Sequence, residues 1–234
     1  MGIRHKLLFI RDANRVWFTS KERARFLTEG LSHRGKAMFE MYHLSDLSFH
    51  KGDFVIDVGA NTGDLLLGFE NFGDDINYCA FECSPRFFQL LQLNASPRHK
   101  VFQVAAWNRQ SIMDLYLRDR TASSSIIQPR GWGETIVVSA ICLDEFMCEI
   151  QHVKLLKIEA EGCEPEVIKG ACEILQRTEY VSVDVGPERG RKQETTEEEV
   201  VTLLLESGFK ILKRYQPGSR SCILFQNAYF SEHL

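Results

Sequence analysis

The fold is decided by residues 53–63, whose sequence is Asp53-Phe54-Val55-Ile56-Asp57-Val58-Gly59-Ala60-Asn61-Thr62-Gly63. A short apolar run meets a glycine-containing turn, and an apolar helical pattern follows. This order predicts a buried parallel strand, a tight turn and a helix start. Gly59 lets the backbone approach a ligand closely, and the first N–H groups of the helix face the same place. We interpret the stretch as a cofactor-binding loop. Because its spacing is not Gly-x-Gly-x-x-Gly, a pyrophosphate site is disfavoured.

A second expected strand, over residues 76–81, ends at Glu82. In nucleoside-binding folds, an acid about 20 residues beyond the loop accepts hydrogen bonds from the ribose hydroxyls. A nucleoside cofactor without a pyrophosphate fits this pair of features best. S-adenosylmethionine is the common cofactor of that kind, and the sequence therefore predicts it.

The rest of the chain alternates strands with helices. Further sheet strands are expected over residues 101–106, 152–158, 180–185, 209–213 and 221–226. Helices are expected to begin after Ser84, over residues 164–175 and after Thr196, with Ser84 and Thr196 as side-chain caps. This rhythm predicts an α/β fold with a doubly wound, mostly parallel seven-stranded sheet and its ligand at the carboxyl ends of the strands.

Two segments depart from the alternation. Residues 1–48 contain apolar positions at helical spacing and are expected to form an N-terminal helical extension, or lid, on the main domain of residues 49–234. Residues 113–117 and 135–140 are expected to be strands of a β-hairpin-like insertion with a long polar loop between them.

Composition and net charge indicate which classes of molecule the protein is expected to bind. The chain has 234 residues, 44% hydrophobic content and a net charge of −4, which argues against a nucleic-acid enzyme with a broad basic surface. The sequence shows no membrane span and no signal peptide. The seven cysteines lack Cys-x-x-Cys spacing, and the histidines lack ligand spacing. We therefore expect reduced thiols, a cytoplasmic location and no required metal.

Three blocks occur in order at residues 57–63, 81–85 and 157–164. Together they resemble the motifs of the FkbM-type S-adenosylmethionine-dependent methyltransferases, over about residues 50 to 215. The resemblance implies a class I, Rossmann-like methyltransferase fold and a methyl acceptor that is a sugar, a glycan or a secondary metabolite. Residues Ser123, Ser124 and Ser125 resemble a serine-containing segment of the family, which makes them weak candidates for substrate or cofactor contacts. One departure is visible, because the family usually has Asp-Val-Glu-Gly where this chain has Glu159-Ala160-Glu161-Gly162.

The resemblance and the patterns select site residues. Asp57 is expected to organise the loop, Asn61 to contact the methionine part of the cofactor, and Glu82 to hold the ribose. Small residues at the end of the third strand are expected to leave room for adenine. The predicted cofactor site consists of Asp57, Gly59, Ala60, Asn61, Gly63, Glu82, Cys83, Ala105 and Ala106.

Methyl transfer to a hydroxyl needs alignment and a proton acceptor. Glu159 and Glu161 follow the fourth strand and Asp184 lies in the fifth, so these three acids are the catalytic candidates. The leading hypothesis is O-methylation of a small-molecule or glycan hydroxyl acceptor, with no nucleic acid and no membrane span. The alternatives are an NAD(P)-dependent Rossmann oxidoreductase and a non-catalytic S-adenosylmethionine-binding module.

Overall fold

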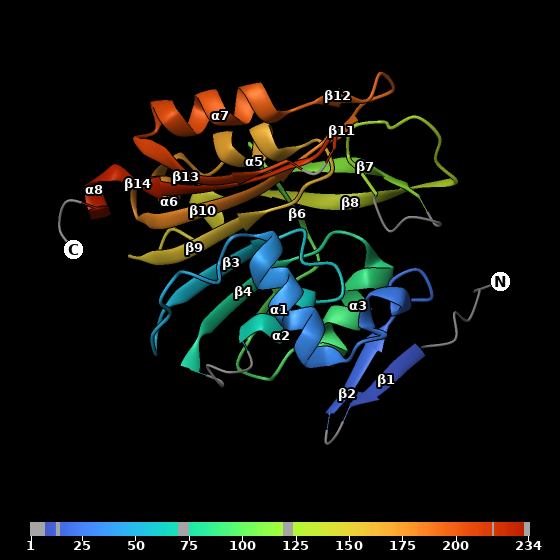
Figure 1. Cartoon of the computed structure of the whole chain (residues 1–234). Coiled ribbons are helices and arrows are strands. Elements are labelled where there is room, and N and C mark those ends of the chain that lie inside the picture. The colour runs from blue at the N-terminus through green and yellow to red at the C-terminus, as the bar shows by residue number, and fades with distance from the viewer. Residues whose placement is uncertain (1–7, 13–14, 70–74, 119–123, 217, 232–234) are drawn as a thin grey trace.

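The computed structural model describes residues 8–12, 15–69, 75–118, 124–216 and 218–231. Its centre is a seven-stranded sheet with the order β13-β14-β10-β9-β3-β4-β5 (Figure 1). The strands are β3 Phe54–Val58, β4 Asn77–Phe81, β5 Lys100–Phe102, β9 Val153–Ile158, β10 Thr178–Val185, β13 Phe209–Tyr215 and β14 Ser221–Asn227. β14 pairs antiparallel with both of its neighbours, and the other pairs are parallel. The predicted mostly parallel sheet is confirmed.

Helices cover both faces of this sheet (Figure 1). Successive residues of β3 point to opposite faces, so Val55 packs in one apolar core and Ile56 in the other. The first core lies under α1 Leu31–Met41, α2 Asp64–Phe69 and α3 Pro85–Asn94. The second lies under α4 Leu143–Phe146, α5 Glu164–Lys169, α6 Cys172–Gln176 and α7 Glu197–Glu206. The fold is therefore doubly wound.

The third strand differs from the prediction. Residues 101–106 do not form one strand, because β5 ends at Phe102 and β6 Ala105–Trp107 joins another sheet. That sheet has the order β6-β8-β7 and contains the predicted hairpin, with β7 Ser111–Leu117 paired antiparallel to β8 Glu134–Cys142. Ala105 pairs with Ala140 of β8. The chain thus leaves the main sheet at the point where the ligand site is expected.

The N-terminal segment contains the expected helices, and a β-hairpin that was not predicted precedes them. β1 Leu8–Asp12 pairs with β2 Arg15–Thr19, followed by the 3-10 helix η1 Ala24–Leu27 and then α1. Trp17 of β2 is fully buried. α1 packs closely on α2, since a Cβ at Gly35 would lie 2.4 Å from the carbonyl oxygen of Leu67.

Smaller differences concern helix ends. Neither Ser84 nor Thr196 caps its helix through its side chain. The Thr196 hydroxyl instead donates to Glu164 at 2.7 Å. The helix expected over residues 164–175 is interrupted between α5 and α6. The break includes Gly170, where a Cβ would lie 2.1 Å from the Trp107 carbonyl oxygen, so the backbones approach closely there. Two short strands, β11 Pro187–Arg189 and β12 Glu194–Thr195, and the helix α8 Ala228–Ser231 complete the described elements. Within the described ranges, no helix combines the length and apolarity needed to cross a membrane.

Candidate active site

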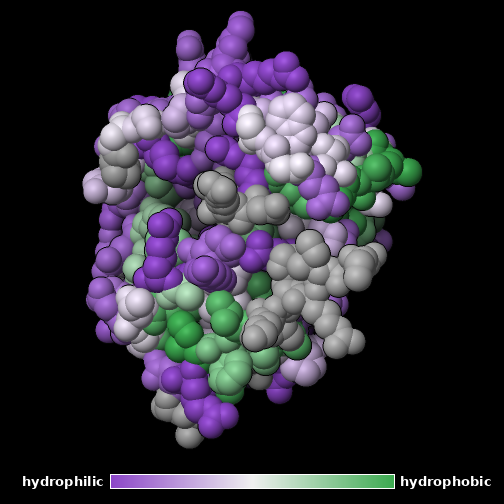
Figure 2. Space-filling model, turned by 90° about the vertical axis from the view of Figure 1, so that its right-hand side faces the viewer, coloured by the Kyte–Doolittle hydropathy of each residue, from purple (hydrophilic) through white to green (hydrophobic). Residues whose placement is uncertain are grey.

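A cavity of about 980 Å³ opens at the carboxyl ends of β3, β4, β9 and β10. Residues from the N-terminal segment, the insertion and β11 complete its walls. Figure 2 views the molecule from the right-hand side of Figure 1, where hydrophilic side chains surround smaller apolar patches. The position agrees with the rule that doubly wound sheets bind ligands beyond the carboxyl ends of their strands.

The turn after β3 is held by the neighbouring strand. The N–H groups of Gly59 and Ala60 both donate to the Phe81 carbonyl, at 2.9 and 3.1 Å. Gly59 has a φ of +73°, and a Cβ there would lie 1.9 Å from the carbonyl oxygen of Glu159. Glycine is therefore required at position 59 for two reasons. It adopts the positive φ of the turn, and it lets the end of β3 lie against the end of β9. Gly63 has a φ of +85° and does not line the cavity, and a Cβ there would lie 2.9 Å from Cδ1 of Leu91.

Glu82 is fixed by backbone donors. Its two carboxylate oxygens accept hydrogen bonds from the N–H groups of Asn61 (2.9 Å) and Ser84 (2.8 Å). The side chain lines the cavity although the residue is only 7% exposed. Burial raises the pKa of Glu82 to about 7, against the opposing effect of the two N–H donors. Each oxygen keeps a lone pair that can accept a hydroxyl proton from a ligand.

One end of the cavity is apolar. Ala105 and Ala106 of β6 line it together with Phe87 of α3, Val104 and Cys83. Burial and the adjacent Glu82 hold the pKa of the Cys83 thiol well above its usual value. A neutral pocket with small side chains beside the Glu82 carboxyl can enclose a flat aromatic base.

A buried lysine lies behind the turn. Lys157 of β9 is 2% exposed, and its Nζ lies 2.9 Å from Oδ1 of Asp57, itself 1% exposed. The same ammonium donates to the carbonyl oxygens of Val58 and Gly59 at 3.2 and 3.0 Å. Tyr78 donates its hydroxyl to the other Asp57 oxygen. Asp57 thus organises the loop from behind and does not line the cavity.

Opposite the turn lie the predicted catalytic acids. Glu159 accepts the Tyr42 hydroxyl at 2.5 Å, and Lys157 lies 3.4 Å away. Burial opposes the charge of Glu159, but Lys157, the Tyr42 hydroxyl and Arg220 outweigh it and lower its pKa. Glu159 is therefore an ionised carboxylate at neutral pH.

Glu161 lies in a different electrostatic environment. Its backbone has a φ of +50°, and the turn around it is held by Glu164, which accepts the N–H groups of Ala160 and Gly162 at 3.0 Å each. Burial, the neighbouring Glu188 and Glu159 hold the pKa of Glu161 well above its usual value. The pKa is therefore lowered at Glu159 and raised at Glu161, although only one residue separates them.

Arg220 connects the remaining acids. Its guanidinium donates to Asp184 at 2.5 Å and to Glu188, and lies 3.9 Å from Glu159. Burial and Glu159 raise the pKa of Asp184 to about 6, although Arg220 counters both. The side chain of Asp184 is therefore engaged with Arg220 at the cavity wall.

The structure brings together most of the predicted residues. The cavity is lined by Gly59, Asn61, Glu82, Cys83, Ala105, Ala106, Glu159, Glu161 and Asp184. Asp57, Ala60 and Gly63 lie behind it. Ser124 lines the cavity and Ser125 donates to the Glu161 carbonyl at 2.8 Å, while Ser123 lies outside the described residues.

Sequence reasoning did not select several charged residues of this region, among them Lys157, Glu188 and Arg220. Lys157 belongs to the block of residues 157–164, and its position in an otherwise apolar strand was the available signal. Nothing local marks Glu188 and Arg220. Arg23 belongs to a run of basic residues near the N-terminus, which the sequence alone made more typical of a solvated helical face than of a site for an acidic substrate.

The fold and the cavity together define a class of protein. A doubly wound sheet with one reversed strand, a glycine turn after β3 and an acid at the end of β4 are the features of a class I methyltransferase. The model of the FkbM methyltransferase domain matches residues 57–211, which is more than half of the chain. The chain therefore belongs to the FkbM methyltransferase family, and its cofactor is S-adenosylmethionine.

Known proteins resemble the chain over most of its length. The 2-O-methyltransferase NoeI of Sinorhizobium fredii (strain NBRC 101917 / NGR234) is 21% identical over 227 residues, covering 88% of this chain and 93% of the relative. Fibrillarin in a fibrillarin/Nop5p complex has a TM-score of 0.55 at 14% identity, covering 94% of this chain and 97% of that one. Aeropyrum pernix fibrillarin, solved with natively bound S-adenosyl-L-methionine, has a TM-score of 0.52 at 10% identity, covering 96% and 84%. The structural likenesses show the fold alone.

Family membership decides between the enzyme classes considered for the sequence. The chain is a methyltransferase, which sets aside the NAD(P)-dependent oxidoreductase and the non-catalytic module. The cavity also fits the cofactor chemically, with a carboxylate beside an apolar pocket. Across the described residues, no cluster of three His, Cys, Asp or Glu side chains could hold a metal ion.

Cofactor binding should depend on pH through Glu82. With a pKa of about 7, this carboxyl is protonated below neutrality and loses an acceptor for the ribose hydroxyls. Affinity for S-adenosylhomocysteine is expected to fall up to roughly tenfold per pH unit as the pH drops below about 7, and to level off above it. Titration calorimetry at several pH values measures this. The Glu82→Gln variant should bind weakly with a flat profile, and an unchanged slope in that variant would assign the effect to another group.

Proposed function

We propose that the protein transfers a methyl group to a hydroxyl oxygen of a small-molecule or glycan acceptor, a sugar being the first choice. The observation that supports this is the cluster of Glu159, Glu161, Asp184 and Glu188 around Arg220, in the same cavity as the cofactor turn. Carboxylates and a guanidinium are good partners for the several hydroxyls of a sugar. The relative NoeI, by its name a 2-O-methyltransferase, agrees with oxygen as the acceptor atom.

The protein's residues divide the work by charge. When bound, S-adenosylmethionine supplies an electrophilic methyl group on a positively charged sulfur. In its ionised form Glu161, whose raised pKa makes it more basic than an ordinary carboxylate, is suited to accept the proton that the acceptor hydroxyl loses. Glu159 stays ionised and can hold a second hydroxyl of the acceptor or balance positive charge in the cavity. Arg220 holds Asp184 and Glu188 in place around the acceptor.

A non-nucleic-acid acceptor remains part of this proposal. The net charge of −4 and the acidic wall of the cavity oppose a polyphosphate chain. The likeness to the fibrillarin structure concerns the fold alone and does not indicate what this chain binds. A cytoplasmic location likewise stays a prediction.

The experiment is an acceptor screen with the full chain and S-adenosylmethionine. S-adenosylhomocysteine release is measured with neutral sugars, oligosaccharides, phenolic and alcoholic metabolites, primary amines and single-stranded RNA, and the methylated atom is located by NMR. A methyl ether on a sugar or metabolite oxygen is the expected product. Methylation confined to nitrogen, carbon or RNA would contradict the proposal.

A further inference from the structure

Arg23 is a buried arginine with an incompletely used guanidinium. It lies on the N-terminal segment just before η1, lines the cavity, and its side chain is 17% exposed. One terminal nitrogen donates to Oδ2 of Asp64 at 2.7 Å. Its Nε is buried and has no hydrogen-bond partner among the described residues. Buried donors in native proteins are almost always satisfied, so this one indicates a ligand.

The neighbours of Arg23 leave local positive charge. Arg34 of α1 also donates to Oδ2 of Asp64, through Nε and a terminal nitrogen at 2.8 Å each. The other Asp64 oxygen accepts the Thr62 hydroxyl at 2.6 Å. Burial opposes the charge of Asp64, yet the two arginines hold its pKa well below the usual range. Two guanidinium groups therefore share one carboxylate, and a bound anion would balance the remaining positive charge.

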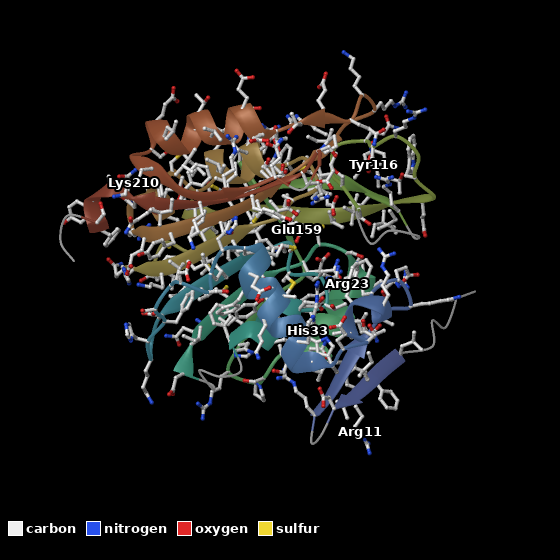
Figure 3. All side chains as sticks on the ribbon, viewed as in Figure 1. Arg11, Arg23, His33, Tyr116, Glu159 and Lys210 are labelled. Carbon is white, nitrogen blue, oxygen red and sulfur yellow. The ribbon has the colours of Figure 1, made fainter. Side chains whose placement is uncertain are left out.

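The position of Arg23 selects the anion. Asp64 is the first residue of α2 and directly follows the turn of residues 59–63. With adenine in the apolar end and the ribose on Glu82, the amino-acid end of the cofactor falls beside this turn. Figure 3 shows Arg23 on the N-terminal segment, below Glu159, and both residues line the cavity. Glu159, the next acid, already accepts Tyr42 and pairs with Lys157.

We propose that Arg23 binds the carboxylate of the methionine part of S-adenosylmethionine. An arginine fork matches a carboxylate in geometry and charge, and Asp64 orients the fork. Arg23 lies outside residues 57–211, the span matched by the family model. The N-terminal segment is thus part of the cofactor site and more than a cover over the acceptor.

The test compares two ligands that differ in that carboxylate. Titration calorimetry measures the affinity of the full chain for S-adenosylmethionine and for decarboxylated S-adenosylmethionine, which keeps the sulfonium and the amine. Arg23→Gln should weaken S-adenosylmethionine about 10- to 100-fold and change the decarboxylated ligand less than about twofold. Arg23→Lys, which keeps the charge without the fork, should fall between wild type and Arg23→Gln.

Arg11→Gln is the matched control, because Arg11 is an exposed arginine of β1 that Figure 3 shows far from Glu159. It should leave both affinities unchanged. An equal loss for both ligands in Arg23→Gln would mean a structural role, and no loss for either would mean no contact, so both results overturn the proposal. Neither result depends on the acceptor, so the inference can stand or fall independently of the proposed reaction.

Discussion

Replacing Glu161 by glutamine is expected to lower kcat about 100-fold or more on the hydroxyl acceptor found by the screen. Glutamine keeps the size of the side chain and removes its ability to take a proton, and a positioned base contributes roughly 10²- to 10⁴-fold. Burial, Glu188 and Glu159 raise the pKa of Glu161, which makes its ionised form more basic than an ordinary carboxylate. Steady-state kinetics with saturating S-adenosylmethionine measures the loss.

Two controls separate chemistry from folding. Affinity for S-adenosylhomocysteine should stay within about twofold, because the role proposed for Glu161 is proton transfer and not cofactor binding. Glu206→Gln, an exposed glutamate at the end of α7, should retain full activity. Full activity in Glu161→Gln combined with a large loss in Glu159→Gln would transfer the role of base to Glu159.

Replacing Lys157 by methionine is expected to lower the free energy of unfolding by about 3–5 kcal/mol, the usual cost of removing one partner of a buried ion pair. Lys157 and Asp57 are almost completely buried and 2.9 Å apart. Methionine retains the apolar stem but leaves the Asp57 carboxylate without its cation. Urea denaturation at neutral pH measures the change, and the midpoint of thermal unfolding should fall by about 6–20 °C.

The same buried pair offers an internal control. Adding Asp57→Asn to Lys157→Met removes the uncompensated charge and should recover part of the lost stability. Lys192→Met, at an exposed lysine 3.9 Å from Glu194, should change the unfolding free energy by less than about 1 kcal/mol. A loss below about 1 kcal/mol for Lys157→Met would show that water, and not Lys157, stabilises Asp57.

The grouping of the residues that are expected to hold the cofactor was predictable from the sequence. Gly59, Asn61 and Glu82 belong to one β-α-β unit, in which two parallel strands must end at the same edge of the sheet. Their spacing along the chain therefore translates directly into proximity. The strands of the sheet were also recognisable, because each has its own local pattern of apolar residues. The ends of the strands were harder to predict, as the division of residues 101–106 between β5 and β6 shows.

The acceptor half depends on contacts between distant segments. Tyr42 precedes Glu159 by 117 residues, and Arg220 follows Asp184 by 36. No local pattern predicts such partners, and the pKa of each acid depends on them: it is lowered at Glu159 and raised at Glu161, although both are glutamates. The hairpin of β1 and β2 was not predicted for the same reason. Trp17 is buried because the N-terminal segment packs on distant parts of the chain, which no local pattern shows.

By itself, the sequence determined the doubly wound sheet, the family and the cofactor, because these rest on short-range patterns that a β-α-β unit converts into position. Only the tertiary structure decided which acid is ionised, which arginine faces the cavity and which glycines serve packing. Those properties arise from burial and from charges brought together across the fold, and both are set by neighbours far away in the chain.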